Sequence, residues 1–178
     1  MLGRQKFLSF VCQTLFAQQP PGLLVETGKE KILGQENQDS FSITKYSFGV
    51  VMVVADGLGT KKYSGIGSKR ICKAVGDAAK IWVEKENAPI EFLIRLVHNL
   101  WDISIYPYSK NECATTCLFC IALNSGKIIL GQLGDGIIYY CNDESLNILS
   151  EKENDFLNIT NSVASARNVY DWTFKEIN

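Results

Sequence analysis

Three short stretches of the sequence each place an aspartate at the glycine-bearing end of a strand-like segment. They are GQENQDS (34–40), VADGLG (54–59) and GQLGDG (131–136), with aspartates Asp39, Asp56 and Asp135. A carboxylate at the end of a buried strand is costly to hold without a partner, because desolvation disfavours its charge. Glycine lets the backbone turn sharply and frees a carbonyl to face a ligand. Oxygen ligands of this kind suit Mg²⁺ and Mn²⁺, so the pattern indicates a metal site.

The same stretches also have a purely structural interpretation. Asp-Gly is a common turn, so any one of them alone would more often be structural, and for Asp135 by itself we expect a turn. Three such strand ends in one small domain favour a shared site, since strand ends on one side of a sheet can converge. Competing motifs fail: GLGTKK has Lys62 where a dinucleotide fingerprint needs glycine, and neither G-x-x-x-x-G-K-[ST] nor G-x-S-x-G occurs.

The cysteines do not form a convincing zinc site. Cys117 and Cys120 lie in CATTCLFC, which has the character of a strand, and alternation along a strand points them to opposite faces. No second C-x-x-C and no nearby histidine completes a set of four ligands. We therefore expect reduced cysteines in the core, which fits a cytoplasmic protein.

The elements that must position the aspartates follow from hydrophobic periodicity. The apolar run 48–54 predicts a buried strand that feeds the Asp56 turn. Apolar residues at spacings of three and four predict a helix over 64–86, and a second helix follows Pro89. The period then changes to two, and the expected strands are 115–123, 127–133 and 137–141. Strands flanking a pair of long helices predict a layered α+β domain.

One histidine is available for acid–base chemistry. His98 lies on the second predicted helix and shares a face with Glu91, Arg95 and Asp102. We therefore expect its side chain to be in solvent. A water bound to a metal ion is the better acid or base, because the ion lowers its pKa toward neutrality.

Length and composition predict one domain of 23–178, preceded by an N-terminal segment of 1–22. Pro20-Pro21-Gly22 separates the two, and we expect a helix in the N-terminal segment. The chain has 178 residues and a net charge of −1, without a block of basic residues, which argues against a nucleic-acid partner. No apolar stretch is long enough to cross a membrane.

The motifs, taken in order, resemble those of the metal-dependent protein phosphatases of the type 2C family. Asn-Gln-Asp-Ser (37–40) is similar to the first family motif, and Ala-Asp-Gly-Leu-Gly (55–59) to the second. KKYSGIGSK (61–69) is similar to the passage into the family's first long helix. Ala-Thr-Thr (114–116) followed by Leu-Gly-Asp-Gly (133–136) is similar to the paired strands before its Gly-Asp motif. The resemblance runs from about residue 27 to residue 160.

The resemblance implies a fold, a reaction and a set of ligands. The fold would be a layered α-β-β-α sandwich, and the reaction hydrolysis of phosphoserine and phosphothreonine in proteins by a metal-bridging water. Two Mg²⁺ or Mn²⁺ ions would be held by Asp39, Asp56 and the carbonyl of Gly57, with Asp135 near an additional ion. Lys61 and Lys62 would contact the substrate phosphate as point charges.

The sequence also departs from the family pattern. Gly34 stands where many members carry a phosphate-binding arginine, and Gln38 where many have glutamate. The two C-terminal metal-binding motifs, Ser/Thr-Asp-Gly and Asp-Asn, do not occur. We therefore expect a C-terminally truncated member in which the C-terminal part of the second sheet is missing and metal binds weakly. An exposed sheet edge would then favour homo-oligomers.

Three readings remain open from the sequence. The first is an active metal-dependent phosphatase acting on phosphorylated proteins. The second is a catalytically inactive phosphatase-like domain that binds phosphoproteins or a partner protein. The third is a plain α+β scaffold in which the Asp-Gly turns are structural.

Overall fold

The structure is a computed structural model that describes residues 9–12, 37–142, 145–149, 161–166 and 168–178. Gly34 and the boundary between residues 22 and 23 lie outside the described residues, so the expectations placed on them stay untested. A five-stranded antiparallel sheet lies at the centre, in the order β2-β3-β4-β5-β8. Its strands are β2 (Ser40–Tyr46), β3 (Gly49–Ala55), β4 (Cys117–Leu123), β5 (Ile128–Leu133) and β8 (Thr173–Ile177).

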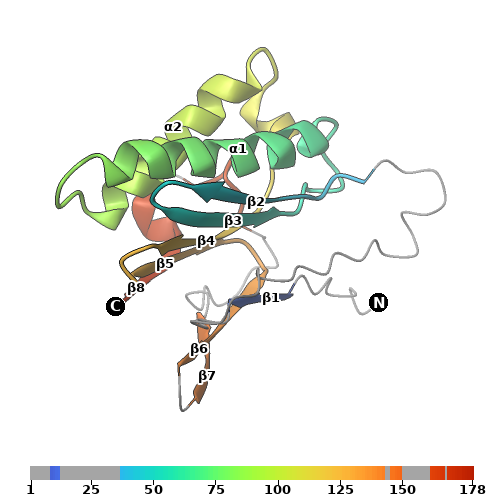
Figure 1. Ribbon diagram of the computed structural model, residues 1–178. Coiled ribbons are helices and arrows are strands. Elements are labelled where there is room, and N and C mark those ends of the chain that lie inside the picture. Colours follow the sequence, from blue (N-terminus) through green and yellow to red (C-terminus); the bar gives the residue numbers. More distant parts are fainter. Residues whose placement is uncertain (1–8, 13–36, 143–144, 150–160, 167) are drawn as a thin grey trace.

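Two helices cover one face of this sheet (Figure 1). They are α1 (Ser64–Val83) and α2 (Ile90–Ile105). Two short 3₁₀ helices, η2 (Lys110–Cys113) and η3 (Val169–Asp171), precede β4 and β8. The helices bury their apolar stripes against alternate residues of the strands, such as Val53 and Phe119. The predicted pair of long helices is therefore confirmed.

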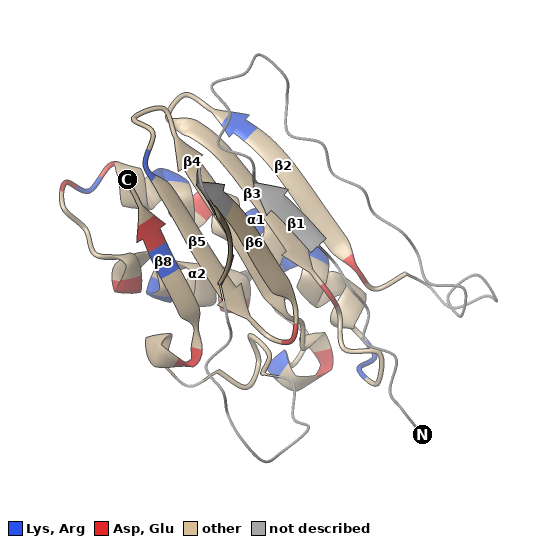
Figure 2. Cartoon of the chain, turned by 90° about the horizontal axis from the view of Figure 1, so that it is seen from below, with Lys and Arg blue, Asp and Glu red and all other residues tan. Residues whose placement is uncertain are grey.

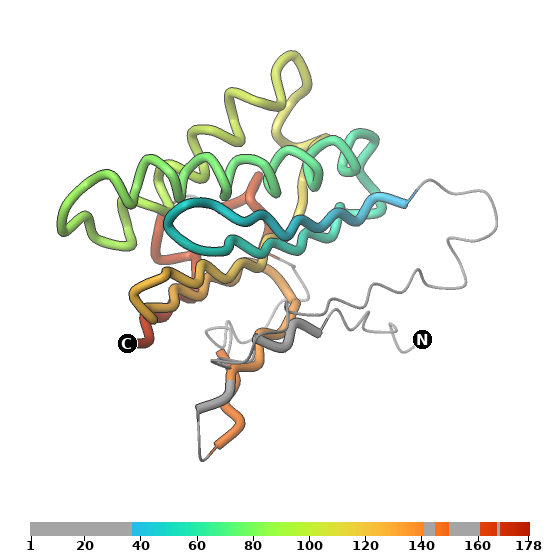
Figure 3. Tube along the Cα trace, viewed as in Figure 1, coloured from blue at the N-terminus to red at the C-terminus, as the bar shows by residue number. Residues whose placement is uncertain are grey.

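A smaller sheet lies against the opposite face (Figure 3). It has the order β1-β6-β7, with strands β1 (Ser9–Cys12), β6 (Ile137–Asn142) and β7 (Ser145–Leu149). Ile138 and Leu149 of the small sheet pack on Met52, Leu130 and their neighbours in the large one. This arrangement of a helical layer on two packed sheets confirms the predicted layered fold.

The expected N-terminal helix is wrong for residues 9–12. These residues form β1, which pairs in parallel with β6 from Ser9↔Ile137 to Cys12↔Tyr140. An extended segment can satisfy its backbone groups on the edge of an existing strand, which a helix cannot do. This pairing overrides the short apolar pattern that suggested a helix.

The buried cysteines behave as the strand alternation predicts. Cys72, Cys113, Cys117 and Cys120 are buried thiols. Cys117 faces the core under the helices, whereas Cys120 faces the core between the two sheets. Burial raises the pKa of the Cys72 thiol to about 12, so this thiol stays protonated at neutral pH.

His98 is not the solvated residue that its helical face suggested. Its Nε2 accepts a hydrogen bond of 2.7 Å from the Trp172 indole, and the two rings meet edge to face with centroids 5.7 Å apart. Burial, followed by the nearby positive charge of Lys110, lowers the pKa of His98 below its usual 6.5. The neutral imidazole thus joins α2 to the segment that leads into β8.

This contact predicts that stability falls on mild acidification. Since the folded-state pKa of His98 is lowered, its contribution is complete above pH ~6.5 and is lost as the pH falls through the folded pKa. Protonation would place a proton on the nitrogen that accepts from Trp172. Between pH 7.5 and 5.5 we expect a loss of about 1 kcal/mol in the free energy of unfolding, the usual size of one hydrogen bond.

Urea denaturation of the wild type and of His98→Gln across that range would measure the effect. Glutamine keeps an acceptor but does not titrate, so its pH dependence should be weaker. Identical pH profiles for the two proteins would contradict the assignment.

Candidate metal centre

Strand register brings Asp39 and Asp56 to the same place. β2 and β3 pair antiparallel from Tyr46↔Gly49 to Ser40↔Ala55. Asp39 immediately precedes β2 and Asp56 immediately follows β3, so continuing the register by one pair sets them opposite each other. Residues directly opposite on antiparallel strands have Cβ atoms about 4.5–5.5 Å apart. Both aspartates are partly buried, as expected for ligands at the rim of a core.

Gly57 allows the Asp56 turn to lie directly against the first motif. A Cβ atom at Gly57 would lie 2.7 Å from the Gln38 carbonyl oxygen and 2.9 Å from that of Ser64. Only glycine fits such a close backbone approach. Within the described part of the chain, the Gly57 carbonyl accepts no hydrogen bond, because those of the bridge to Thr115 are made by Asp56 and Leu58 on either side. That oxygen therefore remains available to a ligand.

Two threonines at the entrance to β4 fix the backbone of Asp56. The Asp56 N–H donates to Thr116 Oγ1 at 3.0 Å, and the Thr116 N–H donates to the Asp56 carbonyl at 2.9 Å. Thr115 Oγ1 donates to the same carbonyl at 3.0 Å. Both threonines are buried. Sequence analysis singled out these residues by resemblance, and the structure gives them a physical role in positioning Asp56.

The first motif is anchored to α1 by hydroxyl groups. Ser68 Oγ donates to the Gln38 carbonyl at 2.5 Å and lies 2.9 Å from Ser40 Oγ. Gln38 Nε2 donates to the Lys61 carbonyl at 3.4 Å. Gln38 therefore links the first motif to the loop after β3. The role of Ser68 could not be predicted from the sequence, because the residue type serine in a helix does not by itself indicate a hydrogen-bond partner.

The turn of Asp135 lies beside the same framework. Gly134 has a φ of 106°, and a Cβ atom there would lie 2.5 Å from Thr116 Cγ2. Gln132 Nε2 closes the turn by donating to the Gly136 carbonyl at 2.5 Å. Asp135 itself is exposed. Acidic segments therefore occur at one end of the large sheet, before β2, after β3 and between β5 and β6 (Figure 2).

The two predicted phosphate-binding lysines lie in the loop between β3 and α1. The Lys61 N–H donates to the Leu58 carbonyl at 2.9 Å, which makes a tight turn next to Gly57. Lys62 is exposed, and its Nζ lies 5.0 Å from the centroid of the Tyr63 ring. Hydrogen bonding to Tyr63 raises the pKa of Lys62, with a further contribution from its charge interaction with that residue, so the amine stays cationic.

The donors that the register brings together are all oxygen atoms. Two carboxylates from facing strand ends and one backbone carbonyl could hold a hard cation, since Mg²⁺ and Mn²⁺ prefer oxygen ligands. Across the described residues, no cluster of three or more His, Cys, Asp or Glu side chains is positioned to hold an ion. The candidate site therefore consists of Asp39, Asp56 and the Gly57 carbonyl, with Asp135 at the periphery.

The chain belongs to the protein phosphatase 2C family, since residues 28–178 match the model of the family described as Protein phosphatase 2C. That match contains every aspartate, glycine and lysine of the candidate site. No curated protein matches the chain.

Several solved structures share the fold at low sequence identity. The serine/threonine phosphatase Stp1 from Staphylococcus aureus superposes with a TM-score of 0.60 and 20% identity, over 100% of this chain and 76% of that one. A bacterial serine phosphatase superposes with a TM-score of 0.53 and 17% identity, over 80% of this chain and 66% of that one. A C. elegans sex determining protein superposes with a TM-score of 0.55 and 13% identity, over 80% of this chain and 45% of that one. These likenesses establish the phosphatase fold, and the chain spans only part of each relative.

The close approach at Gly57 gives a test of the framework. Gly57→Ala forces its Cβ into the Gln38 and Ser64 backbones, so we expect a loss of about 1–3 kcal/mol in the free energy of unfolding. Gly59→Ala is the matched control, because a Cβ there meets nothing within 4 Å. Urea denaturation would compare the two variants. Equal stability would show that the two motifs are not packed together as described.

Proposed function

We propose that the chain is a metal-dependent protein phosphatase that hydrolyses phosphoserine and phosphothreonine. The observation that supports this most directly is the β2–β3 register, which sets Asp39 opposite Asp56 in a member of the protein phosphatase 2C family. Two of the relatives named above, Stp1 and the bacterial serine phosphatase, are phosphatases by their own descriptions, which is consistent with the proposal.

Asp39, Asp56 and the Gly57 carbonyl would hold Mg²⁺ or Mn²⁺, and Asp135 would lie near an additional ion. When bound, such ions activate water as a nucleophile and neutralise phosphoryl oxygens. The fold would hold these ligand residues in position even in the absence of metal. Thr116 fixes the Asp56 backbone and Ser68 fixes the first motif, so little reorganisation is needed on binding.

Lys61 and Lys62 would attract the phosphate group of the substrate. Both lie within the loop that contains Gly57, at the same end of the sheet as the aspartates. Lys62 Nζ is already held over the Tyr63 ring, whereas Lys61 Nζ makes no ring contact or ion pair with the described residues. Lys61 is therefore the better candidate, acting as a point charge rather than as a bidentate ligand.

A second candidate function is a phosphatase-like domain that binds phosphoproteins without hydrolysing them. The small number of carboxylates favours it, since two aspartates bring less negative charge than two divalent ions require. The same lysine loop would then serve as a phosphate-binding surface.

The remaining expectations concern the cellular setting. Among the described residues, no helix is both long and apolar enough to span a membrane. We infer a cytoplasmic phosphatase without a nucleic-acid partner, from the near-neutral net charge and the reduced, buried cysteines. Homo-oligomers through an exposed sheet edge remain part of the proposal.

Metal dependence gives the decisive experiment. Purified protein should release phosphate from a phosphothreonine peptide with Mn²⁺ and not with a chelator present. Asp56→Asn should lower Mn²⁺ affinity at least tenfold in calorimetry and reduce phosphate release by a factor of about 100 or more, because it removes charge from the metal site. Glu86→Gln, an exposed change between the helices, is the control for charge loss and should match the wild type.

The two candidate functions give different outcomes in the same experiment. Mn²⁺ binding without hydrolysis, combined with retained binding of the phosphopeptide, would favour the inactive domain. If millimolar Mn²⁺ neither binds nor supports phosphate release, the enzyme proposal is wrong.

A further inference from the structure

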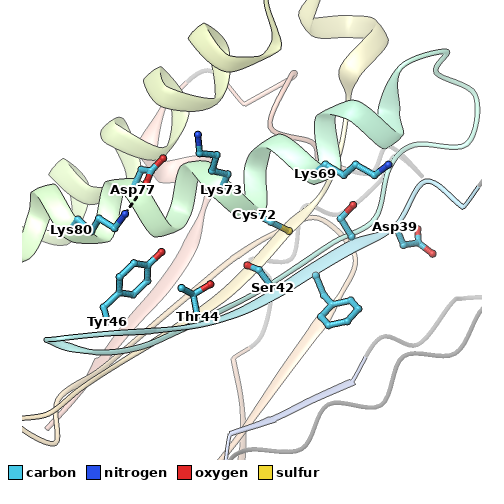
Figure 4. Close-up of a pocket in the computed structure, with 11 residues that line it drawn as sticks. Asp39, Ser42, Thr44, Tyr46, Lys69, Cys72, Lys73, Asp77 and Lys80 are labelled. Atoms are coloured by element: carbon cyan, nitrogen blue, oxygen red, sulfur yellow. Dashed lines mark hydrogen bonds and ion pairs between the residues drawn. The ribbon is translucent and has the colours of Figure 1, made fainter.

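A groove runs between strand β2 and helix α1 and shares only Asp39 with the ligand set described above. Its volume is about 610 Å³. From β2 and the residue before it, the groove is lined by Asp39, Ser40, Phe41, Ser42, Thr44 and Tyr46, and from α1 by Lys69, Cys72, Lys73, Asp77 and Lys80. We refer to this feature as the β2–α1 groove (Figure 4). One of its ends is at Asp39, so it leads directly away from the candidate metal centre.

The groove exists because the strand has only small side chains between the two ends where it packs on the helix. At one end Ser40 Oγ lies 2.9 Å from Ser68 Oγ. At the other end the Tyr46 hydroxyl packs on Gly76, where a Cβ atom would force it to shift. Between these contacts the strand presents the small side chains of Ser42, which hydrogen-bonds Cys72, and Thr44. Two small residues in succession on this face leave the space open.

The charges in the groove favour an anionic ligand. Lys80 is paired with Asp77 at 3.2 Å and its amine lies 5.0 Å from the centroid of the Tyr46 ring, which closes the far end. Lys69 and Lys73 are exposed one helical turn apart, and neither is paired with an acid among the described residues. Asp39 is the one other acid in the lining, so the two unpaired lysines leave the groove with a net positive charge.

The strand that forms the floor can also accept another strand. β2 is the edge of the five-stranded sheet within the described residues. In an edge strand the backbone N–H and C=O groups of alternate residues point outward, and an extended peptide can pair with them. From Ser40 to Tyr46 the strand has seven residues, so it could pair with a segment about 20 Å long.

We propose that the β2–α1 groove binds an extended acidic segment of the protein substrate, added as a strand to β2, with its carboxylates next to Lys69 and Lys73. The segment adjoins the phosphorylated residue, because the groove begins at Asp39. That the bound segment belongs to a substrate rests on the proposed phosphatase function, whereas binding of an acidic segment to the groove does not. The groove would therefore select phosphorylation sites that have acidic neighbours.

Three ligands distinguish binding in the groove from hydrolysis at the candidate metal centre. The first is a small aryl phosphate, which is too short to reach the groove. The second is a phosphothreonine peptide with aspartate and glutamate on both sides, and the third is the same peptide with asparagine and glutamine instead. Mn²⁺-dependent hydrolysis is measured for all of them, and fluorescence anisotropy measures binding of the two labelled peptides without metal.

The test variant is Lys69→Gln with Lys73→Gln. We expect kcat/KM for the acidic peptide to fall about 3- to 10-fold through KM, and its affinity without metal to fall by a similar factor. The kcat/KM for the aryl phosphate and for the neutral peptide, and the affinity for the neutral peptide without metal, should not change. Raising the salt from about 0.05 to about 0.3 M should weaken acidic-peptide binding to the wild type in the same way. The control is Arg70→Gln with Lys85→Gln, which removes equal charge from exposed positions outside the groove.

Each outcome supports or overturns the proposal. If the test and control variants behave alike toward the acidic peptide, the groove is not its binding site. If the wild type does not hydrolyse the aryl phosphate but the test variant still loses affinity for the acidic peptide, the proposed phosphatase function is wrong and the groove as a binding site for acidic segments is supported.

Thr44→Trp distinguishes a second occupant of the same groove. Thr44 is exposed on the edge strand, where tryptophan is compatible with strand geometry, and the larger side chain would fill the groove. We expect this change to abolish acidic-peptide binding. If sedimentation shows a dimer that Thr44→Trp dissociates, and the peptide does not bind, the groove is an interface between two copies and the proposal is overturned.

Discussion

The antiparallel register of β2 and β3 is the constraint on which the candidate site depends. A shift of one residue would move every β2 side chain to the other face of the sheet, and Asp39 would no longer lie opposite Asp56. Ser42 and Thr44 would then turn away from α1, and the neighbouring apolar residues Phe41 and Ile43 would turn toward it. The Ser40–Ser68 contact holds the register at one end and the packing of Tyr46 on Gly76 holds it at the other. The candidate metal site and the β2–α1 groove therefore both follow from one strand pairing.

Helix α1 gives up intrinsic stability to make these contacts. It contains Gly65, Gly67 and Gly76, and glycine inside a helix costs up to about 1 kcal/mol relative to alanine. The structure shows what is gained at two of these positions. Gly67 meets the Cys113 carbonyl and accepts a 3.1 Å hydrogen bond from the Trp101 indole, and Gly76 receives Tyr46. Close packing against α2, η2 and β2 thus compensates for a weaker helix.

The sequence alone predicted the elements whose pattern is local and strong. Both long helices and the apolar strands β3, β4 and β5 are confirmed close to their expected bounds. β2 was missed because SFSITKY combines small polar residues with isolated apolar ones, and the helix that covers it is needed to explain the pattern. β8 was missed for a similar reason, since its five residues become a strand only by pairing with β5, which lies more than 40 residues earlier. Long-range pairing leaves little trace in a short window of sequence.

The candidate site divides in the same way between what is local and what is not. The Asp-Gly turns could be located from sequence, because each carries its glycine beside it. His98 could not be placed, because its partner Trp172 is 74 residues away and the helical face around it is charged. Nor could the positions of Thr116 and Ser68 be assigned a role before their hydrogen bonds to Asp56 and Gln38 were seen.

The hydrogen bonds from Thr115, Thr116 and Ser68 to Asp56 and Gln38 join backbone groups to neutral hydroxyls. These hydrogen bonds should therefore persist when the charge of an aspartate is removed. A family member can in this way keep the whole fold and lose its metal, because the forces that build the scaffold are separate from those that bind the ion. The family fold is encoded in the packing of glycines and threonines, whereas the proposed activity would depend on the electrostatics of the two aspartates that they position.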